Sequence, residues 1–289
     1  MAGVTTFLAM AYITVVNPGI LSAAGMDFGA VFVATCLAAA IGTAIMGLYA
    51  NYPVAQAPGM GQNAFFTYGI VLGMGHSWES ALGAVFISGL IFIALSVLPV
   101  REWLINAMPR SLKLGISAGI GFFLGIIALS GSGIIVSNEA TLVSLGDLTE
   151  TPAILMLFGF VVIAALSARR VVGAVVLGML LVTLLGWATG AAEFAGVFSA
   201  PPPLTTLFEL DIAAALDLSM VTVIITLLLV DVFDTAGTLV GVANRAGMLD
   251  DNGHLPRLRR ALLSDSSATA IGALLGTSST TSYIESAAG

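Results

Sequence analysis

Three carboxylate side chains lie in segments whose other residues are mostly apolar or small. Asp231 and Asp234 occur in the stretch LLLVDVFDTAGT, and Glu285 follows a run of glycine, serine and threonine. The i, i+3 spacing of the two aspartates puts them on one helical face. An acidic side chain at bilayer depth costs about 2.5–3.5 kcal/mol on insertion scales, so it normally faces a cavity and has a function. The alternative is a buried carboxyl group that serine and threonine hydroxyls satisfy.

Residues 53–71 contribute a second polar cluster, with Gln62 and Asn63 at its centre. Amide side chains both donate and accept hydrogen bonds, and the aromatic rings of Phe65 and Tyr283 can stack on a planar molecule. A flat heterocycle bearing N–H and C=O groups would satisfy this set of partners. An inorganic anion would be repelled by the carboxylates.

The same acids suggest an energy source. Removal from water disfavours the charged form of a carboxyl group, so we expect at least one of Asp231, Asp234 and Glu285 to carry a proton near neutral pH. A site that takes up a proton together with its substrate is a symporter. Sodium is the competing ion, although the sequence contains no compact all-oxygen cage. We expect no metal site and no cofactor.

The composition identifies the setting of these residues as a lipid bilayer. The chain has 289 residues, 58% of them hydrophobic and 9% charged, with a mean hydropathy of +1.06. Soluble domains carry about 25% charged residues. We expect a polytopic protein of the cell (inner) membrane that does not bind nucleic acid.

Apolar runs of roughly 17–25 residues mark the membrane spans. They are expected at 3–24, 28–50, 79–98, 110–131, 152–168, 171–189 and 217–243, with a further span at about 261–275. Residues 53–71 contain Pro53 and Pro58, which exclude a continuous helix. An extended stretch followed by a half-helix fits this third crossing better, and we expect the same construction at 276–289. Such backbone survives at membrane depth only where it lines a protein cavity.

The basic residues test this count of spans. All nine fall in loops on one side of the expected membrane: Arg101, Arg110, Lys113, Arg169, Arg170, Arg245, Arg257, Arg259 and Arg260. The opposite loops hold acids and no Lys or Arg: Asp27, Glu79, Glu139, Asp147, Glu150, Glu193, Glu209 and Asp211. The positive-inside rule then predicts a cytoplasmic N-terminus.

A faint internal repeat relates the two broken crossings. The triplet Ala-Gly-Met occurs at 24–26, after span 1, and at 246–248, after span 8. A broken, polar segment follows two spans later in each case. Seven spans separate the copies, so the second runs inverted through the membrane. Paired discontinuous helices in inverted repeats are typical of secondary transporters, whose substrate binds between them.

Four stretches resemble the AzgA-like adenine/guanine/hypoxanthine permeases, within the xanthine/uracil permease superfamily of nucleobase–cation symporters. These stretches are residues 3–13 with Asn17-Pro18, 57–66 (APGMGQNAFF), 231–238 (DVFDTAGT) and 276–289 (GTSSTTSYIESAAG). The resemblance covers essentially the whole chain.

The resemblance implies a seven-plus-seven inverted-repeat fold that is all-α except for two short strands. It implies a core domain at 1–98 (spans 1–4) and 217–289 (spans 8–10), and a gate domain at 99–190 (spans 5–7). Since the tenth span begins near 276, we expect a chain that is C-terminally incomplete and lacks spans 11–14. Dimerisation is expected for a full-length chain.

The implied activity is import of adenine, guanine or hypoxanthine by proton symport, with an elevator-like motion. Glu285 and Asp234 match the family's nucleobase-holding acids, with Asp231 one turn away, and Asn63 is the matching position of span 3. The residues expected to contact substrate are Asp231, Asp234, Glu285, Asn63, Gln62, Phe65, Tyr283, Ile284 and Thr238. Alternatives are a uracil/xanthine-type or other nucleobase permease, a channel, or an anion carrier of the same fold. The sequence shows no nucleophile–base pair of the kind that would indicate an enzyme.

Overall fold

The computed structural model describes residues 2–98, 110–171, 173–192, 200–250 and 255–289. The chain divides into two compact units, each continuous in space but not in sequence. The smaller unit comprises Met1–Tyr12 and Leu114–Ala200, and the larger comprises Ile13–Lys113 and Pro201–Ala287. The core and gate domains expected at 1–98 with 217–289 and at 99–190 remain a prediction. Arg101 and Glu193, used in the topology argument, lie outside the described residues.

The smaller unit contains an antiparallel pair of helices and a hairpin. Its elements are α1 (Ala2–Met10), most of α8 (Arg110–Gly131), β2 (Ile135–Asn138), β3 (Leu142–Leu145), α9 (Thr151–Ala168) and α10 (Ala174–Ala188). Glycines allow α9 and α10 to approach closely, since a Cβ atom on Gly178 would lie 2.2 Å from Ile163 Cγ1. The β2–β3 hairpin was not predicted from the sequence, because its strands are short and lie in a polar connection.

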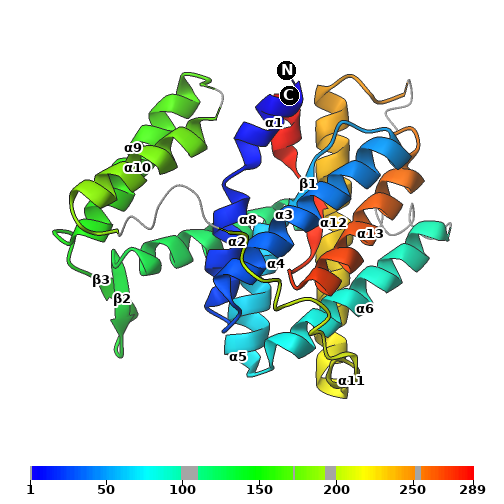
Figure 1. Ribbon diagram of the computed structural model, residues 1–289, viewed down its shortest axis with the longest axis horizontal. Coiled ribbons are helices and arrows are strands. Elements are labelled where there is room, and N and C mark those ends of the chain that lie inside the picture. The colour runs from blue at the N-terminus through cyan, green and yellow to red at the C-terminus, as the bar shows by residue number, and fades with distance from the viewer. Residues whose placement is uncertain (1, 99–109, 172, 193–199, 251–254) are drawn as a thin grey trace. The chain divides into compact units, whose positions relative to one another are not determined.

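Besides the helical turns of the two broken crossings, the described residues of the larger unit form α2 (Ile13–Ser22), α3 (Phe28–Ile45), η1 (Met46–Ala50), α6 (Trp78–Val97), α11 (Ile212–Ala215), η3 (Leu218–Met220), α12 (Val221–Arg245) and α13 (Leu258–Leu275). In Figure 1, α12 is the long yellow helix and α13 the orange one beside it.

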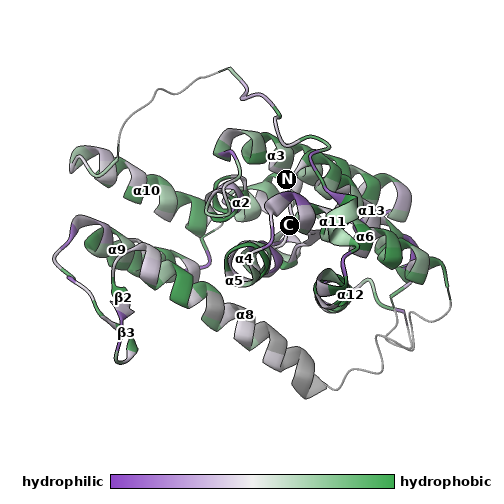
Figure 2. Ribbon diagram, turned by 90° about the horizontal axis from the view of Figure 1, so that it is seen from below, coloured by the Kyte–Doolittle hydropathy of each residue, from purple (hydrophilic) through white to green (hydrophobic). Residues whose placement is uncertain are grey.

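Five helical stretches among the described residues are long and apolar enough to cross a membrane: Ala2–Ser22, Phe28–Ala50, Trp78–Val97, Thr151–Ala168 and Leu218–Arg245. They agree with the spans expected at 3–24, 28–50, 79–98, 152–168 and 217–243. Figure 2 shows hydrophobic residues along most of the helical surfaces, with the hydrophilic colour gathered in connections. Such a surface suits contact with lipid tails rather than with water.

The first span departs from the expected single helix at 3–24. A turn at Ala11 and Tyr12 separates α1 from α2. Pro18, inside α2, lacks an N–H, and its ring displaces the carbonyl four residues earlier. Pro18 therefore weakens the first turns of α2, where it removes the hydrogen bond to the carbonyl of Thr14.

Both broken crossings contain a short strand followed by helical turns. The first consists of β1 (Gln56–Pro58), α4 (Met60–Ala64), the π-helical η2 (Phe65–Val71) and α5 (Leu72–Met74). The second consists of β4 (Thr280–Ser282) and the 3-10 helix η4 (Ile284–Ala288). The two strands pair antiparallel, with Gln56 opposite Ser282 and Pro58 opposite Thr280, and the red C-terminal strand runs beside the blue β1 in Figure 1.

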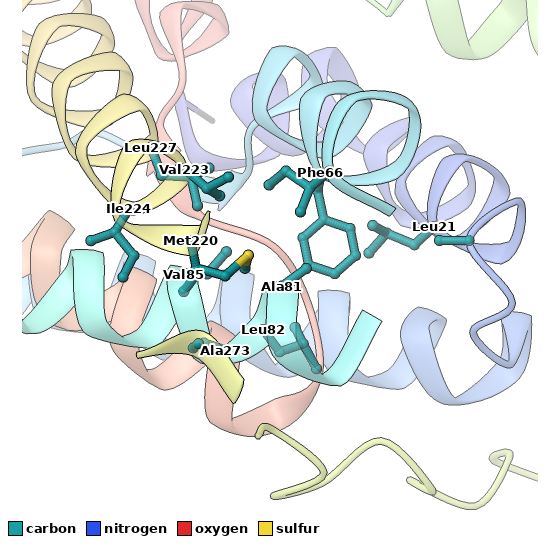
Figure 3. Packing of buried hydrophobic residues seen from close by; sticks show 14 of the residues in the cluster. Leu21, Phe66, Ala81, Leu82, Val85, Met220, Val223, Ile224, Leu227 and Ala273 are labelled. Atoms are coloured by element: carbon teal, nitrogen blue, oxygen red, sulfur yellow. The ribbon is translucent and has the colours of Figure 1, made fainter. Parts of the chain in front are cut away.

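A hydrophobic cluster joins the first broken crossing to the helices around it. Phe66 and Leu82 are both fully buried in it, together with Met220, the last residue of η3. Figure 3 shows side chains from α2, the first broken span, α6, α12 and α13 meeting in this cluster. The cluster holds the first half-helix against α6 and α12 and thereby fixes the polar residues on its other side.

Candidate functional site

The two aspartates of α12 differ in their surroundings. Asp231 is fully buried, whereas Asp234, one turn later, is exposed. Asp231 Oδ1 accepts a hydrogen bond of 3.1 Å from Gln62 Nε2, and Thr269 Oγ1 lies 3.0 Å from Asp231 Oδ2. The predicted meeting of the first broken span with the acids of span 8 is therefore present as a direct contact.

Gln62 and Asn63, the two amide side chains of α4, are both buried, and each forms one side-chain hydrogen bond. Gln62 uses its Nε2 for Asp231, which leaves Oε1 without a hydrogen bond. Asn63 Oδ1 accepts from the hydroxyl group of Ser278, just before β4, which leaves Nδ2 without a partner. A buried polar atom without a partner costs about 1–3 kcal/mol. One acceptor and one donor are thus left for a ligand or a water molecule.

Asp265 of α13 is a buried acid that the sequence analysis did not select. Its Oδ1 accepts from Gln56 Nε2 at 3.0 Å and from Ser282 Oγ at 2.8 Å. Its Oδ2 accepts from Thr235 Oγ1 of α12 at 2.6 Å. The signal was available, because Asp265 is an acid within the expected span at 261–275, the same feature that selected Asp231.

The start of η4 brings in Tyr283 and Glu285. Tyr283 is buried and its hydroxyl group donates to the carbonyl oxygen of Pro58 at 2.5 Å, across the strand pair. Glu285 is half-buried, and its carboxylate acts electrostatically on Asp234. Asp234 also acts on Asp231 and on Asp265. Four carboxyl groups from α12, α13 and η4 therefore belong to one electrostatic cluster.

Three further residues were predicted to contact the substrate, namely Phe65, Thr238 and Ile284. Phe65 packs against the hydrophobic cluster that contains Phe66. Ile284 is 54% exposed, and Thr238 is half-buried on α12, one turn after Asp234. Their roles in substrate binding remain predictions.

Asn17 forms a hydrogen bond to the second broken span. It is fully buried in α2, next to Pro18, and its Nδ2 donates to Thr35 Oγ1 at 2.7 Å and to Thr277 Oγ1 at 2.8 Å. Thr277 precedes β4 by three residues. The Asn17-Pro18 motif therefore connects spans 1 and 2 to the segment that carries Ser278.

A contact at one end of the unit ties together the connections that lead to β1 and to α13. The Tyr52 hydroxyl group donates to the carbonyl oxygen of Pro256, and the Arg257 guanidinium lies 5.1 Å from the centre of the Tyr52 ring. Burial raises the pKa of Tyr52, and the charge of Arg257 opposes this. This contact joins the connection before β1 to the connection before α13.

In the described part of the chain, no three His, Cys, Asp or Glu side chains gather in a way that could hold a metal ion. The carboxyl groups of Asp231 and Asp265 have amide and hydroxyl groups as hydrogen-bond partners. Such an arrangement can bind a polar organic molecule through hydrogen bonds and can accept or release protons.

The chain is similar to permeases along its whole length. The permease family Xan_ur_permease matches residues 1–289. Relatives that align over the full chain include MJ0326 of Methanocaldococcus jannaschii (53% identical, 67% of its length), guanine/hypoxanthine permease PbuG of Bacillus subtilis (49%, 68%) and adenine permease AdeP of Escherichia coli (46%, 65%). The chain thus spans about two thirds of the length of these relatives.

A solved structure confirms the expected fold class. The transmembrane domain of the cyanobacterial bicarbonate transporter BicA superposes with a TM-score of 0.67 over 99% of this chain and 74% of that one, at 16% sequence identity. Identity this low speaks for the fold alone. The family and the apolar helices together describe a multi-pass membrane protein that is a transporter rather than an enzyme.

The motifs around Asn63, Asp234 and Glu285 are thus part of a similarity that extends from one end of the chain to the other. Because the family match covers residues 1–289 and relatives at 46–53% identity align over the full chain, this chain belongs to the permease family Xan_ur_permease.

Proposed function

We propose that the protein imports purine nucleobases together with protons. The observation that carries this proposal is the pairing of the two broken spans through β1 and β4, together with the contact of Gln62, from the first of these spans, with Asp231 of α12. The names of AdeP and PbuG, an adenine and a guanine/hypoxanthine permease, support purines as the substrate class.

The free polar atoms match the edge of a nucleobase. Gln62 Oε1 is a buried acceptor and Asn63 Nδ2 a buried donor, and a purine ring presents adjacent N–H and C=O or N groups. The carboxylates of Asp234 and Glu285 add acceptors for ring N–H groups. The ring of Tyr283 provides an aromatic face on which a flat base can stack.

The acids favour a neutral substrate that travels with a cation. Asp231, Asp234, Asp265 and Glu285 form one electrostatic cluster, which would repel an anion. A proton is the simplest cation for such a cluster because it binds one carboxyl group without a coordination cage. Sodium would need several oxygen ligands around one point.

The family resemblance supports a proposed mechanism, and the positions of the basic loops support a proposed topology. We propose an elevator-like movement of a core domain, which carries the site, against a gate domain. In the cell membrane the basic loops would face the cytoplasm, as would the N-terminus. A homodimer of the full-length protein is part of the same proposal.

Uptake of radiolabelled hypoxanthine and adenine tests the function. The full-length gene product would be expressed in cells that lack their own purine permeases, and uptake measured at about pH 6 and about pH 8. We expect stronger uptake at the lower pH, insensitivity to the removal of sodium, and loss of uptake in Glu285→Gln.

Glu79→Gln is the matched control, because Glu79 lies in the first turn of α6, outside the carboxylate cluster. A well-expressed protein that takes up uracil or xanthine but neither purine would overturn the substrate assignment. Uptake that follows a sodium gradient at constant pH would overturn the choice of proton.

A further inference from the structure

The hydroxyl group of Thr269 lies within hydrogen-bonding distance of two oxygen atoms, each of which can accept a hydrogen bond. Thr269 Oγ1 is 2.9 Å from the carbonyl oxygen of Thr280 and 3.0 Å from Asp231 Oδ2. A threonine hydroxyl carries one hydrogen, and a backbone carbonyl can only accept. Both contacts can be hydrogen bonds when Thr269 donates its hydrogen to the carbonyl oxygen of Thr280. The carboxyl group of Asp231 is then protonated and donates to Thr269 Oγ1.

The other oxygen of Asp231 agrees with this arrangement. Gln62 Nε2 donates to Asp231 Oδ1 at 3.1 Å. An uncharged carboxyl group has one oxygen that accepts and one O–H that donates, which is the pattern seen here. The hydrogen bonds then run in one direction, from Gln62 through Asp231 and Thr269 to the backbone of β4.

Asp265 has the opposite surroundings. Its two oxygens face an amide N–H of Gln56 and the hydroxyls of Ser282 and Thr235. These groups can all donate, and a carboxylate accepts from several donors at once. Asp265 is therefore suited to remain ionised.

The charged groups around Asp231 are acids. Asp265 faces it from α13 and Asp234 from its own helix, and Glu285 acts on Asp234. The described elements packed against α12 add few others: α4 and β4 contain no titratable side chain, Glu79 of α6 lies in that helix's first turn, and Arg259 and Arg260 of α13 are exposed. A second negative charge beside Asp265 would have no cation to balance it, so one proton is shared unequally by the pair.

We propose that Asp231 holds the transported proton from behind the substrate site, while Asp265 stays ionised and anchors the crossing of β1 and β4. The inference rests on the proposed symport and identifies the residue that performs it. Only an O–H bond is made and broken: Asp231 takes the proton from water on the outer side and returns it to water on the cytoplasmic side.

Loss of the proton would change the site through Thr269. An ionised Asp231 draws the single hydrogen of Thr269 to itself, so the carbonyl group of Thr280 loses its hydrogen bond to α13. β4 and the half-helix that follows it are then held less firmly, and Gln62 faces a full negative charge. The proton therefore favours the arrangement in which Gln62 Oε1 and Asn63 Nδ2 are in place for the purine.

Asp231→Asn tests this role, because asparagine keeps one acceptor and one donor in the positions of the uncharged acid. Binding of radiolabelled hypoxanthine to the purified full-length protein would be measured from about pH 6 to about pH 8. Where binding requires one proton, the affinity falls about tenfold per pH unit above the pKa of the site. We expect that slope in the wild type and a flat profile, with loss of proton-driven accumulation, in Asp231→Asn.

Asp234→Asn is the matched control, with the same chemical change one turn along α12. We expect it to weaken binding but to keep the slope. A flat profile in Asp234→Asn together with a sloping one in Asp231→Asn would overturn the assignment. A wild type that binds no purine would instead count against the proposed function.

Infrared spectroscopy keeps the test independent of transport and of the folding of Asp231→Asn. The wild-type protein near neutral pH should show the C=O band of a protonated carboxylic acid, and the band should shift in Thr269→Val, which removes the hydroxyl at nearly constant volume. Absence of the band in the wild type, or a band unmoved in Thr269→Val, would refute a protonated Asp231.

Discussion

Gln56 and Ser282 stand opposite each other where β1 and β4 cross, and both donate to the same oxygen of Asp265. Each strand is only three residues long, too short to be stable alone. The carboxylate of α13 therefore serves as a third partner that fixes the register of the two broken spans.

Replacing this carboxylate should destabilise the fold. Asp265→Ala removes the acceptor of the Ser282 and Thr235 hydroxyls and leaves Gln56 Nε2 only its longer contact with Ser282. Each buried hydroxyl left without an acceptor costs about 1–3 kcal/mol. Thermal unfolding of the purified protein should show a clearly lower midpoint. Asp234→Ala is the control, since Asp234 is exposed and its removal should leave the midpoint nearly unchanged. Equal midpoints for the two variants would contradict the anchoring role.

Two neighbouring serines should differ in their effect on binding. Ser278 orients the amide of Asn63 through a hydrogen bond, whereas the buried hydroxyl group of Ser279 has no partner. Ser278→Ala should weaken purine binding by about twofold to tenfold, because a neutral hydrogen bond contributes about 0.5–1.5 kcal/mol. Ser279→Ala should bind like the wild type. Equilibrium binding to the purified protein decides, and a larger loss in Ser279→Ala would show that Asn63 is oriented by something else.

Asn17 should matter more than its partner Thr35. Asn17→Ala removes hydrogen bonds to Thr35 and Thr277 and leaves a cavity in a buried site, so we expect a loss of roughly 2–3 kcal/mol of stability. Thr35→Ala removes one of them and leaves the bond from Asn17 to Thr277 intact. Denaturation of both variants under the same conditions measures the difference. Matching losses would mean that the contact with Thr277 contributes nothing.

Alanine substitutions at Gly25 and Gly276 distinguish the cost of a left-handed backbone conformation from the cost of a steric clash. Gly25 and Gly276 have φ of +89° and +92°, but a Cβ atom on Gly25 would meet nothing within 4 Å, whereas one on Gly276 would lie 2.2 Å from Thr206 Cβ. Gly25→Ala should cost about 1–2 kcal/mol for the left-handed conformation alone. Gly276→Ala should cost about 1–3 kcal/mol more, seen as a lower yield of folded protein and a lower unfolding midpoint. Indistinguishable variants would mean that Thr206 moves aside freely.

Much of this architecture could be predicted because membranes impose simple local rules. Apolar runs located five of the spans, and the prolines and glycines around Gln62 located the first broken crossing. The acids of α12 were predicted to be site residues because a charge in an apolar run is costly. These signals are all local in sequence.

The contacts of Asp265 could not be predicted in that way. Its partners come from β1, β4 and α12, and Gln56 lies 209 residues away from it. The importance of Gln56, a single amide in an extended stretch, depends entirely on that distant acid. The difference between Asp231 and Asp234 also required the structure, because i, i+3 spacing places both on one face but does not say which one packs against α13.

The pairing of β1 with β4 also constrains how the protein is made. Gln56 leaves the ribosome 226 residues ahead of Ser282, so the first broken crossing enters the bilayer long before its hydrogen-bonding partner exists. During that interval the unpaired peptide groups of β1 need temporary hydrogen-bond partners, which water, α3 or the insertion machinery can provide. The proposed substrate site therefore cannot form before β4 has been synthesised.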